Sequence, residues 1–208
     1  VGISDEMVWQ GRDSPPDAVL DELKDFDFLQ DRWPSKPDLM AAASDLLGGQ
    51  LRFESCSAHI NLPFSAQDLE HTPAPCDLPL AGFFVPDVFL RAYEASGREE
   101  FLSAAQAFVL GADEYEQRAW LPRGQFWNDH AISARVSVLS NFWRLYRHSP
   151  SYRPDVARQV MSMVARSEAL LANPGLFTVA TNHGIMQNLA LWHASLAFPA
   201  LPHTQEYQ

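Results

Sequence analysis

Two short polar clusters carry the residues in this chain that are best suited to chemistry. In one of them, Asn182 and His183 stand where a strongly apolar helix is expected to begin, and Thr181 before them could cap that helix. Free backbone N–H groups at a helix N-terminus bind anions, an amide side chain adds a donor, and an imidazole titrates near neutral pH. The pair could therefore bind a carboxylate and move a proton beside it. It could equally cap the helix and satisfy neighbouring backbone groups.

The other cluster surrounds the start of a helix expected to begin at Asp129. Its side chains suit sugar binding, because indole faces stack on the apolar face of a pyranose while polar groups hydrogen-bond to its hydroxyls. In the alternative interpretation the tryptophans fill the bottom of a helical layer, and Asp129 caps the helix and pairs with Arg135. A charged group beside an apolar stripe, as Arg135 would be, needs a partner or a ligand. The cluster comprises Trp120, Trp127, Asn128, His130 and Arg135.

Both clusters lie in a run of helices that the apolar spacing predicts from residue 86 onward. Apolar residues recur at steps of three and four, and proline or glycine separates most of the segments. Five helices without intervening strands predict an all-α fold of antiparallel helical hairpins, and apolar residues on more than one face favour an incomplete (α/α) toroid. The predicted helices are 87–96, 98–120, 129–148, 154–171 and one within 178–198. On the last helix we expect a buried stripe of Ile185, Leu189, Trp192 and Leu196.

Residues 1–80 are expected to form an irregular, partly extended N-terminal wrap of the same domain, and residues 81–208 its helical-hairpin toroid portion. Short helices are predicted at 18–29, with Asp17 as the cap, and at 37–47, whereas residues 51–62 favour extended chain. Four prolines between residues 63 and 79 exclude long helices there.

The composition excludes several classes of function. A chain of 208 residues with 47% hydrophobic residues is globular, and no apolar run reaches the roughly 20 residues of a membrane span. The net charge of −11 divides into −12 for residues 1–110 and +1 for residues 111–208, so nucleic acid is not an expected partner. No serine-hydrolase, phosphate-loop or dinucleotide motif is present. Cys56 and Cys76 lack metal-ligand spacing, so no metal site is expected; they could form a disulfide after export or remain two buried thiols.

The two clusters together resemble the heparinase II/III-like polysaccharide lyases, which include heparinase III and oligoalginate lyases. The resemblance rests on the run from Trp127 to Ala131 with Arg135 on its helix, followed about fifty residues later by Thr181-Asn182-His183-Gly184 opening an Ala- and Leu-rich helix. It covers roughly residues 80–200.

The resemblance implies β-elimination at a uronic acid without a cofactor, in a periplasmic or secreted protein whose toroid is followed by a β-sandwich domain. Catalysis would fall to Asn182, which neutralises the C5 carboxylate, and to His183, which assists or acts as base. The substrate, an acidic polysaccharide or oligosaccharide, would be bound by Trp127, Asn128, His130, Arg135 and Gln187.

The chain departs from these lyases in one respect. They use a tyrosine several tens of residues beyond the Asn-His pair, whereas this chain ends 25 residues after His183. We therefore expect a fragment that lacks the catalytic tyrosine. The alternative function is a non-catalytic helical-repeat module that binds carbohydrate or protein.

Overall fold

The computed structural model describes residues 2–24, 36–53, 56–65, 72–119, 124–177 and 182–207. The chain is mainly helical, which confirms the predicted all-α class, while the toroid arrangement stays a prediction. By its internal contacts the chain forms two compact units. Unit 1 combines Val1–Phe28 with Asn128–Gln208, and unit 2 is Leu29–Trp127. The predicted division at residue 80 stays a prediction.

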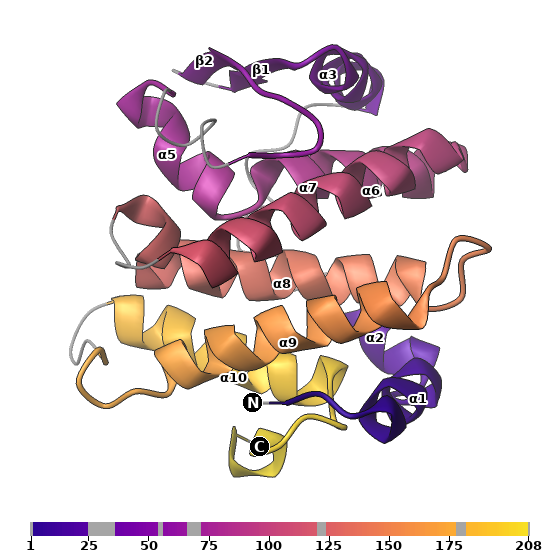
Figure 1. Cartoon of the computed structure of the whole chain (residues 1–208). Coiled ribbons are helices and arrows are strands. Elements are labelled where there is room, and N and C mark those ends of the chain that lie inside the picture. The colour runs from indigo at the N-terminus through magenta and orange to yellow at the C-terminus, as the bar shows by residue number, and fades with distance from the viewer. Residues whose placement is uncertain are drawn as a thin grey trace. The chain divides into compact units, whose positions relative to one another are not determined.

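Unit 1 is built around three long helices, α8, α9 and α10, each of which packs against the other two (Figure 1). The helix α1 packs on α9, and α2 packs on both α8 and α10. Among the described residues of unit 1, none of the helices is long and apolar enough to span a membrane, and the same holds for those of unit 2. The elements are α1 (Asp5–Asp13), α2 (Asp17–Leu23), α8 (Asp129–Tyr146), α9 (Pro154–Leu171), α10 (Asn182–Ala197) and the 3-10 turn η3 (Thr204–Tyr207).

Local signals explain why α8 and α9 begin where they do. Asn128 occupies the N-cap of α8 and its side-chain oxygen accepts a hydrogen bond from the His130 N–H at 2.9 Å. Pro154 opens α9, because proline lacks the N–H that a first helical residue leaves unused. The apolar residues that recur at steps of four and three along α8 are buried: Ile132, Val136, Leu139, Trp143 and Tyr146.

The predicted face of α10 is wrong. Ile185, Leu189 and Trp192 are 63%, 38% and 37% exposed, and α10 instead buries a face of small and polar residues. Small side chains let a helix approach its neighbours closely. Of the elements that α10 contacts, α8 is the one with which it shares the most extensive contact. Apolar residues lie on both faces of α10, so periodicity alone could not select the packed one. The buried face includes Gly184, Gln187, Ala190, Ala194 and Ala197.

A buried arginine joins the C-terminal end of α8 to the connection between α1 and α2. The Arg147 side chain is 1% exposed; its Nη1 donates to the Pro15 carbonyl at 2.7 Å, and its Nη2 donates to the Asp17 carboxylate. Its carbonyl accepts from Arg12 Nε at 3.3 Å. Asp17 is the first residue of α2 rather than its predicted cap, since Pro16 holds the N-cap position. The helix α1, capped by Ser4, was not predicted.

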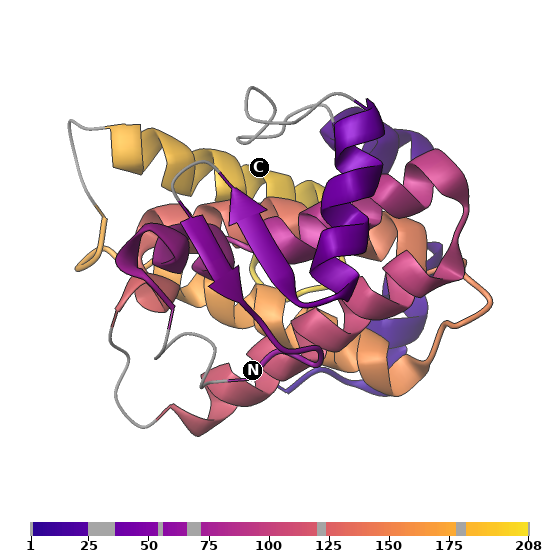
Figure 2. The same cartoon turned by 90° about the horizontal axis from the view of Figure 1, so that it is seen from above.

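In unit 2 a small antiparallel hairpin packs against α3 and α5, α3 packs against α6, and α6 packs against α7 (Figure 2). The hairpin pairs Gln50 with His59 and Phe53 with Cys56, which confirms extended chain at these strands. Gly97 ends α6 in a left-handed conformation with φ of 69°, which glycine adopts without strain. The elements are α3 (Lys36–Leu47), β1 (Gln50–Phe53), β2 (Cys56–His59), α5 (Ala74–Ala81), α6 (Phe84–Ser96), α7 (Glu99–Arg118) and the 3-10 turn η2 (Gln125–Trp127).

Two contacts tie the irregular part of unit 2 to its helices. Cys56 on β2 and Cys76 on α5 form a disulfide, which decides between the two alternatives left open for the cysteines. The Phe64 ring lies 4.4 Å from the Phe108 ring on α7, and its backbone passes so close to Gly111 that a side chain at that position would collide with it. These contacts fix Phe64 against α7 and β2 against α5.

Candidate functional site

The first turn of α8 places two ionisable side chains beside the N-terminus of α10. The His130 N–H is shared by two acceptors, Asn128 Oδ1 and Asp129 Oδ1, each at 2.9 Å. These bonds hold the turn in place and orient the Asp129 carboxylate. Because α8 and α10 lie side by side in unit 1, residues 54 positions apart in the sequence meet here.

Asp129 and His183 form a close pair. His183 Nδ1 lies 2.8 Å from Asp129 Oδ2 and 3.0 Å from Oδ1. An ionised carboxylate only accepts hydrogen bonds, so Nδ1 carries the proton, and a neutral His183 ring then presents Nε2 as a proton acceptor. The two side chains are 38% and 19% exposed for His183 and Asp129, so the pair is accessible without being fully solvated.

His130 completes what we call the Asp–His cluster: Asp129, His130 and His183. The His130 and His183 rings are 3.9 Å apart between centroids and meet edge to face at 69°. One potential ligand atom from each of the three residues lies within 4.8 Å of the other two. Within the described part of the chain, the buried Nε2 of His130 has no hydrogen-bond partner.

Asn182 is the first residue of α10 and is exposed. Because the side chain is exposed, its amide is accessible to a ligand, beside the backbone N–H groups of the first turn. The two predicted catalytic residues therefore stand at an accessible helix N-terminus, where His183 contacts His130 of the other predicted cluster. Thr181, the predicted cap, lies outside the described residues.

Two predicted substrate-binding residues are buried instead. Arg135 is 0% and Gln187 is 1% exposed, and Gln187 Nε2 donates to the Leu176 carbonyl at 3.2 Å, which ties α10 to the preceding loop. No surface of either side chain is left for direct contact with a polymer, so we assign both to the packing of unit 1.

The predicted aromatic platform stays a prediction. Trp127 belongs to unit 2, where its ring lies 5.6 Å from Phe126 at an angle of 72°, and it is half-buried. Trp120 lies outside the described residues. The site in unit 1 is therefore described without either tryptophan.

Asp129 is the site residue that the sequence did not single out. Its position before His130 suggested a helix cap or a partner for Arg135, because those residues are neighbours in the sequence. The pairing with His183 depends on how α10 packs on α8, and no local signal reports that packing.

Other buried titratable groups in unit 1 do not belong to this cluster. Burial lowers the pKa of His193 to about 4, so this ring is neutral near pH 7. Ten residues separate it from His183, about 15 Å along a helix. Burial also raises the pKa of Glu168 on α9 to about 7.

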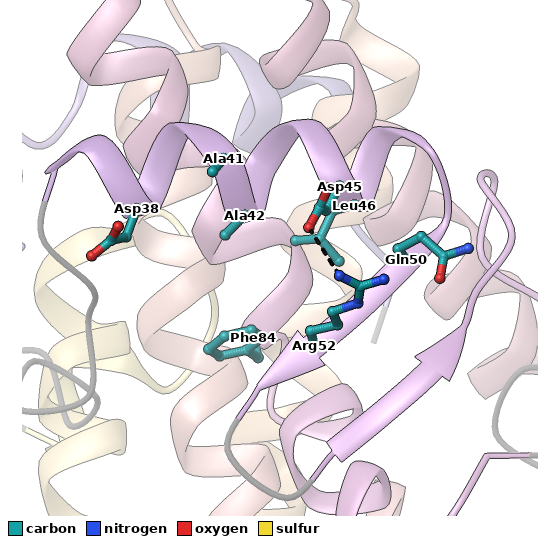
Figure 3. A pocket seen from close by; sticks show the side chains of 8 residues that line it. All are labelled: Asp38, Ala41, Ala42, Asp45, Leu46, Gln50, Arg52 and Phe84. Carbon is teal, nitrogen blue, oxygen red and sulfur yellow. Dashed lines mark ion pairs between the residues drawn. The ribbon is translucent and has the colours of Figure 1, made fainter.

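A second candidate is a surface hollow of about 290 Å³ in unit 2, bounded by α3, β1 and α6 (Figure 3). Its rim carries Asp45 and Arg52, which are 4.0 Å apart and 53% and 70% exposed, and apolar residues including Leu46 and Phe84 line it. An exposed ion pair of this kind contributes little to the stability of the fold. The hollow offers an apolar surface rather than converging catalytic groups, so the Asp–His cluster is the stronger candidate.

Comparison of the chain with protein-family models, with curated proteins and with solved structures finds no significant match. The geometry of the Asp–His cluster and Asn182 therefore carries the functional argument.

Proposed function

We propose that unit 1 forms part of the substrate site of a lyase that cleaves a uronic-acid-containing polysaccharide by β-elimination. One observation carries the proposal: an exposed Asn182 at the N-terminus of α10 adjoins a His183 ring whose Nδ1 is held by Asp129. This arrangement combines an anion-binding helix end with an oriented proton acceptor.

The chemistry follows from the weak acidity of the proton on C5 of a uronic acid. Hydrogen bonds from the Asn182 amide and from first-turn N–H groups of α10 would neutralise the adjacent carboxylate and stabilise the enolate-like intermediate. The C5–H bond breaks and its proton passes to Nε2 of His183. The C4–O bond then breaks, a C4–C5 double bond forms, and the leaving oxygen takes a proton from a general acid. The resemblance assigns that acid to a tyrosine several tens of residues after the Asn-His pair of these lyases.

Asp129 has a positioning role in this scheme. Its carboxylate fixes the tautomer that leaves Nε2 free, and its charge stabilises the imidazolium that forms after proton transfer. His130, edge to face with His183 at 3.9 Å, restricts the ring on another side. Neither residue needs to touch the sugar to have this effect.

Wider features fit the same proposal. A disulfide between Cys56 and Cys76 suits an oxidising compartment, which supports a periplasmic or secreted location. Residues 111–208 carry a net charge of +1 against −12 for residues 1–110, so most residues of the proposed site lie in the part of the chain that repels a polyanion least. We further propose that the helical hairpins belong to an incomplete toroid followed by a β-sandwich domain.

The test is an ultraviolet assay for unsaturated uronic acid, run on the full-length protein with alginate, heparan sulfate and hyaluronan. We expect activity on at least one polymer, and a loss of about 100-fold or more for Asn182→Ala and for His183→Ala. His203→Ala, at an exposed histidine that pairs with Glu206, is the control and should retain activity. A correctly folded protein that releases no unsaturated product from any uronate polymer would refute the lyase proposal.

A non-catalytic binding module is the second candidate, and the exposed stripe on α10 favours it. Ile185, Leu189 and Trp192 place three large apolar side chains on one accessible helix face. This alternative predicts that Leu189→Ser and Trp192→Ser abolish binding of the partner, whereas Asn182→Ala and His183→Ala leave it unchanged. The lyase proposal predicts the opposite sensitivity for turnover.

A further inference from the structure

The geometry points to a binding site for a zinc-type transition-metal ion formed by Asp129, His130 and His183. One nitrogen or oxygen atom from each residue lies within 4.8 Å of the other two, and the residues come from the first turns of two adjacent helices. This inference goes beyond the proposed lyase and does not depend on it.

The chemistry of the three side chains selects the class of metal. Two imidazole nitrogens and one carboxylate oxygen suit Zn²⁺ and its neighbours in the first transition row, whereas Mg²⁺ and Ca²⁺ prefer sites made of oxygen alone. The sequence-based expectation of no metal considered the cysteines only. It could not include this set, because His183 is 53 residues from His130 in the sequence.

The distances are close to what such an ion requires. Ligand atoms around a tetrahedral zinc ion are separated by roughly 3.3 Å, as follows from metal–ligand distances of about 2.0–2.1 Å. The 2.8 Å between His183 Nδ1 and Asp129 Oδ2 is a hydrogen bond without metal, and this pair would open by about 0.5 Å as an ion replaces the shared proton. The three side chains are all partly exposed, so small rotations can bring the wider separations into range.

A second observation concerns His130. Its Nε2 atom is buried and has no hydrogen-bond partner among the described residues, which is costly for a polar atom. Its ring also lies edge to face against the His183 ring, so the two imidazoles stand side by side where one ion could bind both. A coordinate bond to Nε2 would remove the cost of leaving this atom without a partner.

Three protein ligands leave a fourth position on a tetrahedral ion. Sites of this composition hold water or substrate in that position, whereas structural zinc sites use four protein ligands. His183 and Asp129 are 38% and 19% exposed, so solvent can reach an ion bound between them.

The experiment is a titration of the untagged full chain with Zn²⁺ in competition with a chromophoric chelator. We expect one ion per chain, and a loss of affinity of at least about tenfold for His130→Ala, for His183→Ala and for Asp129→Ala, since even outer partners of a metal ligand cost this much when removed. Co²⁺ should give the intense visible bands of a four-coordinate site in the wild type. Far-ultraviolet circular dichroism checks each fold, and His183→Gln serves if an alanine variant unfolds.

The controls separate this inference from simpler outcomes. His203 Nδ1 lies 2.9 Å from Glu206 Oε1, so His203→Ala removes a matched histidine–carboxylate pair and should leave the zinc affinity unchanged. Asn182→Ala should also retain zinc binding while it lowers any lyase activity, so the two proposals can fail independently. The inference is overturned if the wild type binds zinc no more tightly than a His130→Ala/His183→Ala double variant, or if Co²⁺ gives no four-coordinate spectrum.

Discussion

The two ends of α8 show how one helix can serve two purposes. At its C-terminal end, Arg147 is buried at 1% exposure and directs two guanidinium nitrogens to fixed acceptors, the Pro15 carbonyl and the Asp17 carboxylate. At its N-terminal end, Asp129 is partly exposed and faces the titratable ring of His183. The buried Arg147 guanidinium, bound to a backbone carbonyl and a carboxylate, stabilises the fold. The partly exposed Asp129 carboxylate instead contacts an imidazole that can exchange a proton, so it is available for chemistry.

Asp129→Asn should have the largest effect of the variants considered: it should lower turnover strongly and leave the stability almost unchanged. An asparagine side chain of nearly the same shape can offer its N–H to His183 Nδ1, which favours the tautomer that lacks a free acceptor at Nε2. We expect lyase turnover of the full-length protein to fall by about 100-fold, with little change in the urea midpoint. The split between kcat and KM supplies the readout specific to positioning, because kcat should fall while KM stays close to the wild-type value. Unchanged kcat would contradict the role assigned to Asp129.

Arg147→Ala should give the converse result. The variant loses a buried side chain and leaves the Pro15 carbonyl without its donor, so the free energy of unfolding should fall by about 2 kcal/mol. Urea denaturation measures this change. Arg153→Ala is the control, because Arg153 and Asp155 form an exposed pair, 66% and 53% accessible, whose loss should change stability by less than about 0.5 kcal/mol. If Arg147→Ala and Arg153→Ala lowered the free energy of unfolding equally, the stabilising role assigned to the buried Arg147 would be wrong.

The smallest expected effect is the loss of the stability that the Arg147–Asp17 contact contributes, as the pH falls. The hydrogen bond from Arg147 lowers the pKa of Asp17, so the native state binds that proton less readily than the unfolded state. The associated stability is present above the unfolded pKa of about 3.9 and is lost as pH falls through the lowered value. The Asp17 side chain is 65% exposed, so solvent screening limits the contribution to less than about 1 kcal/mol.

This contribution can be measured by comparing the wild type with Arg147→Ala in urea at pH 6 and at progressively lower pH. The difference in stability between the two proteins should narrow below about pH 4. His148, 3.4 Å from Asp17, remains in the variant and keeps part of the electrostatic attraction. A difference that widens in acid would show that another group controls this end of the helix.

The helices that could be predicted well carry strong local signals at their ends. Pro154 and Leu171 bound α9 as expected, and Gly97 terminates α6 as expected, because proline and glycine act through the backbone of their own residues. The start of α8 at Asp129 follows from its cap in the same way. The helix α1 was missed even though Ser4 caps it and Asp5 and Glu6 occupy its first turn, signals that the sequence does contain.

The packing of α10 could not be predicted by the same means. Ile185, Leu189 and Trp192 are large hydrophobic residues and were expected to be buried, but the structure buries Gly184 and Ala190 on another face. Where both faces of a helix are apolar, the shape of the neighbouring helix decides which face fits. That information lies in α8, which no window along α10 contains.

The sequence by itself determined the all-α class, most helix boundaries, and the pair Asn182–His183 at the start of a helix, since these depend on residues within one or two turns of each other. Only the tertiary structure decided that His183 meets Asp129 and His130, that Arg135 and Gln187 are buried, and that Cys56 bonds to Cys76. The physical reason is distance along the chain. Packing between α8 and α10 joins residues 54 positions apart, and no periodicity or capping signal extends that far.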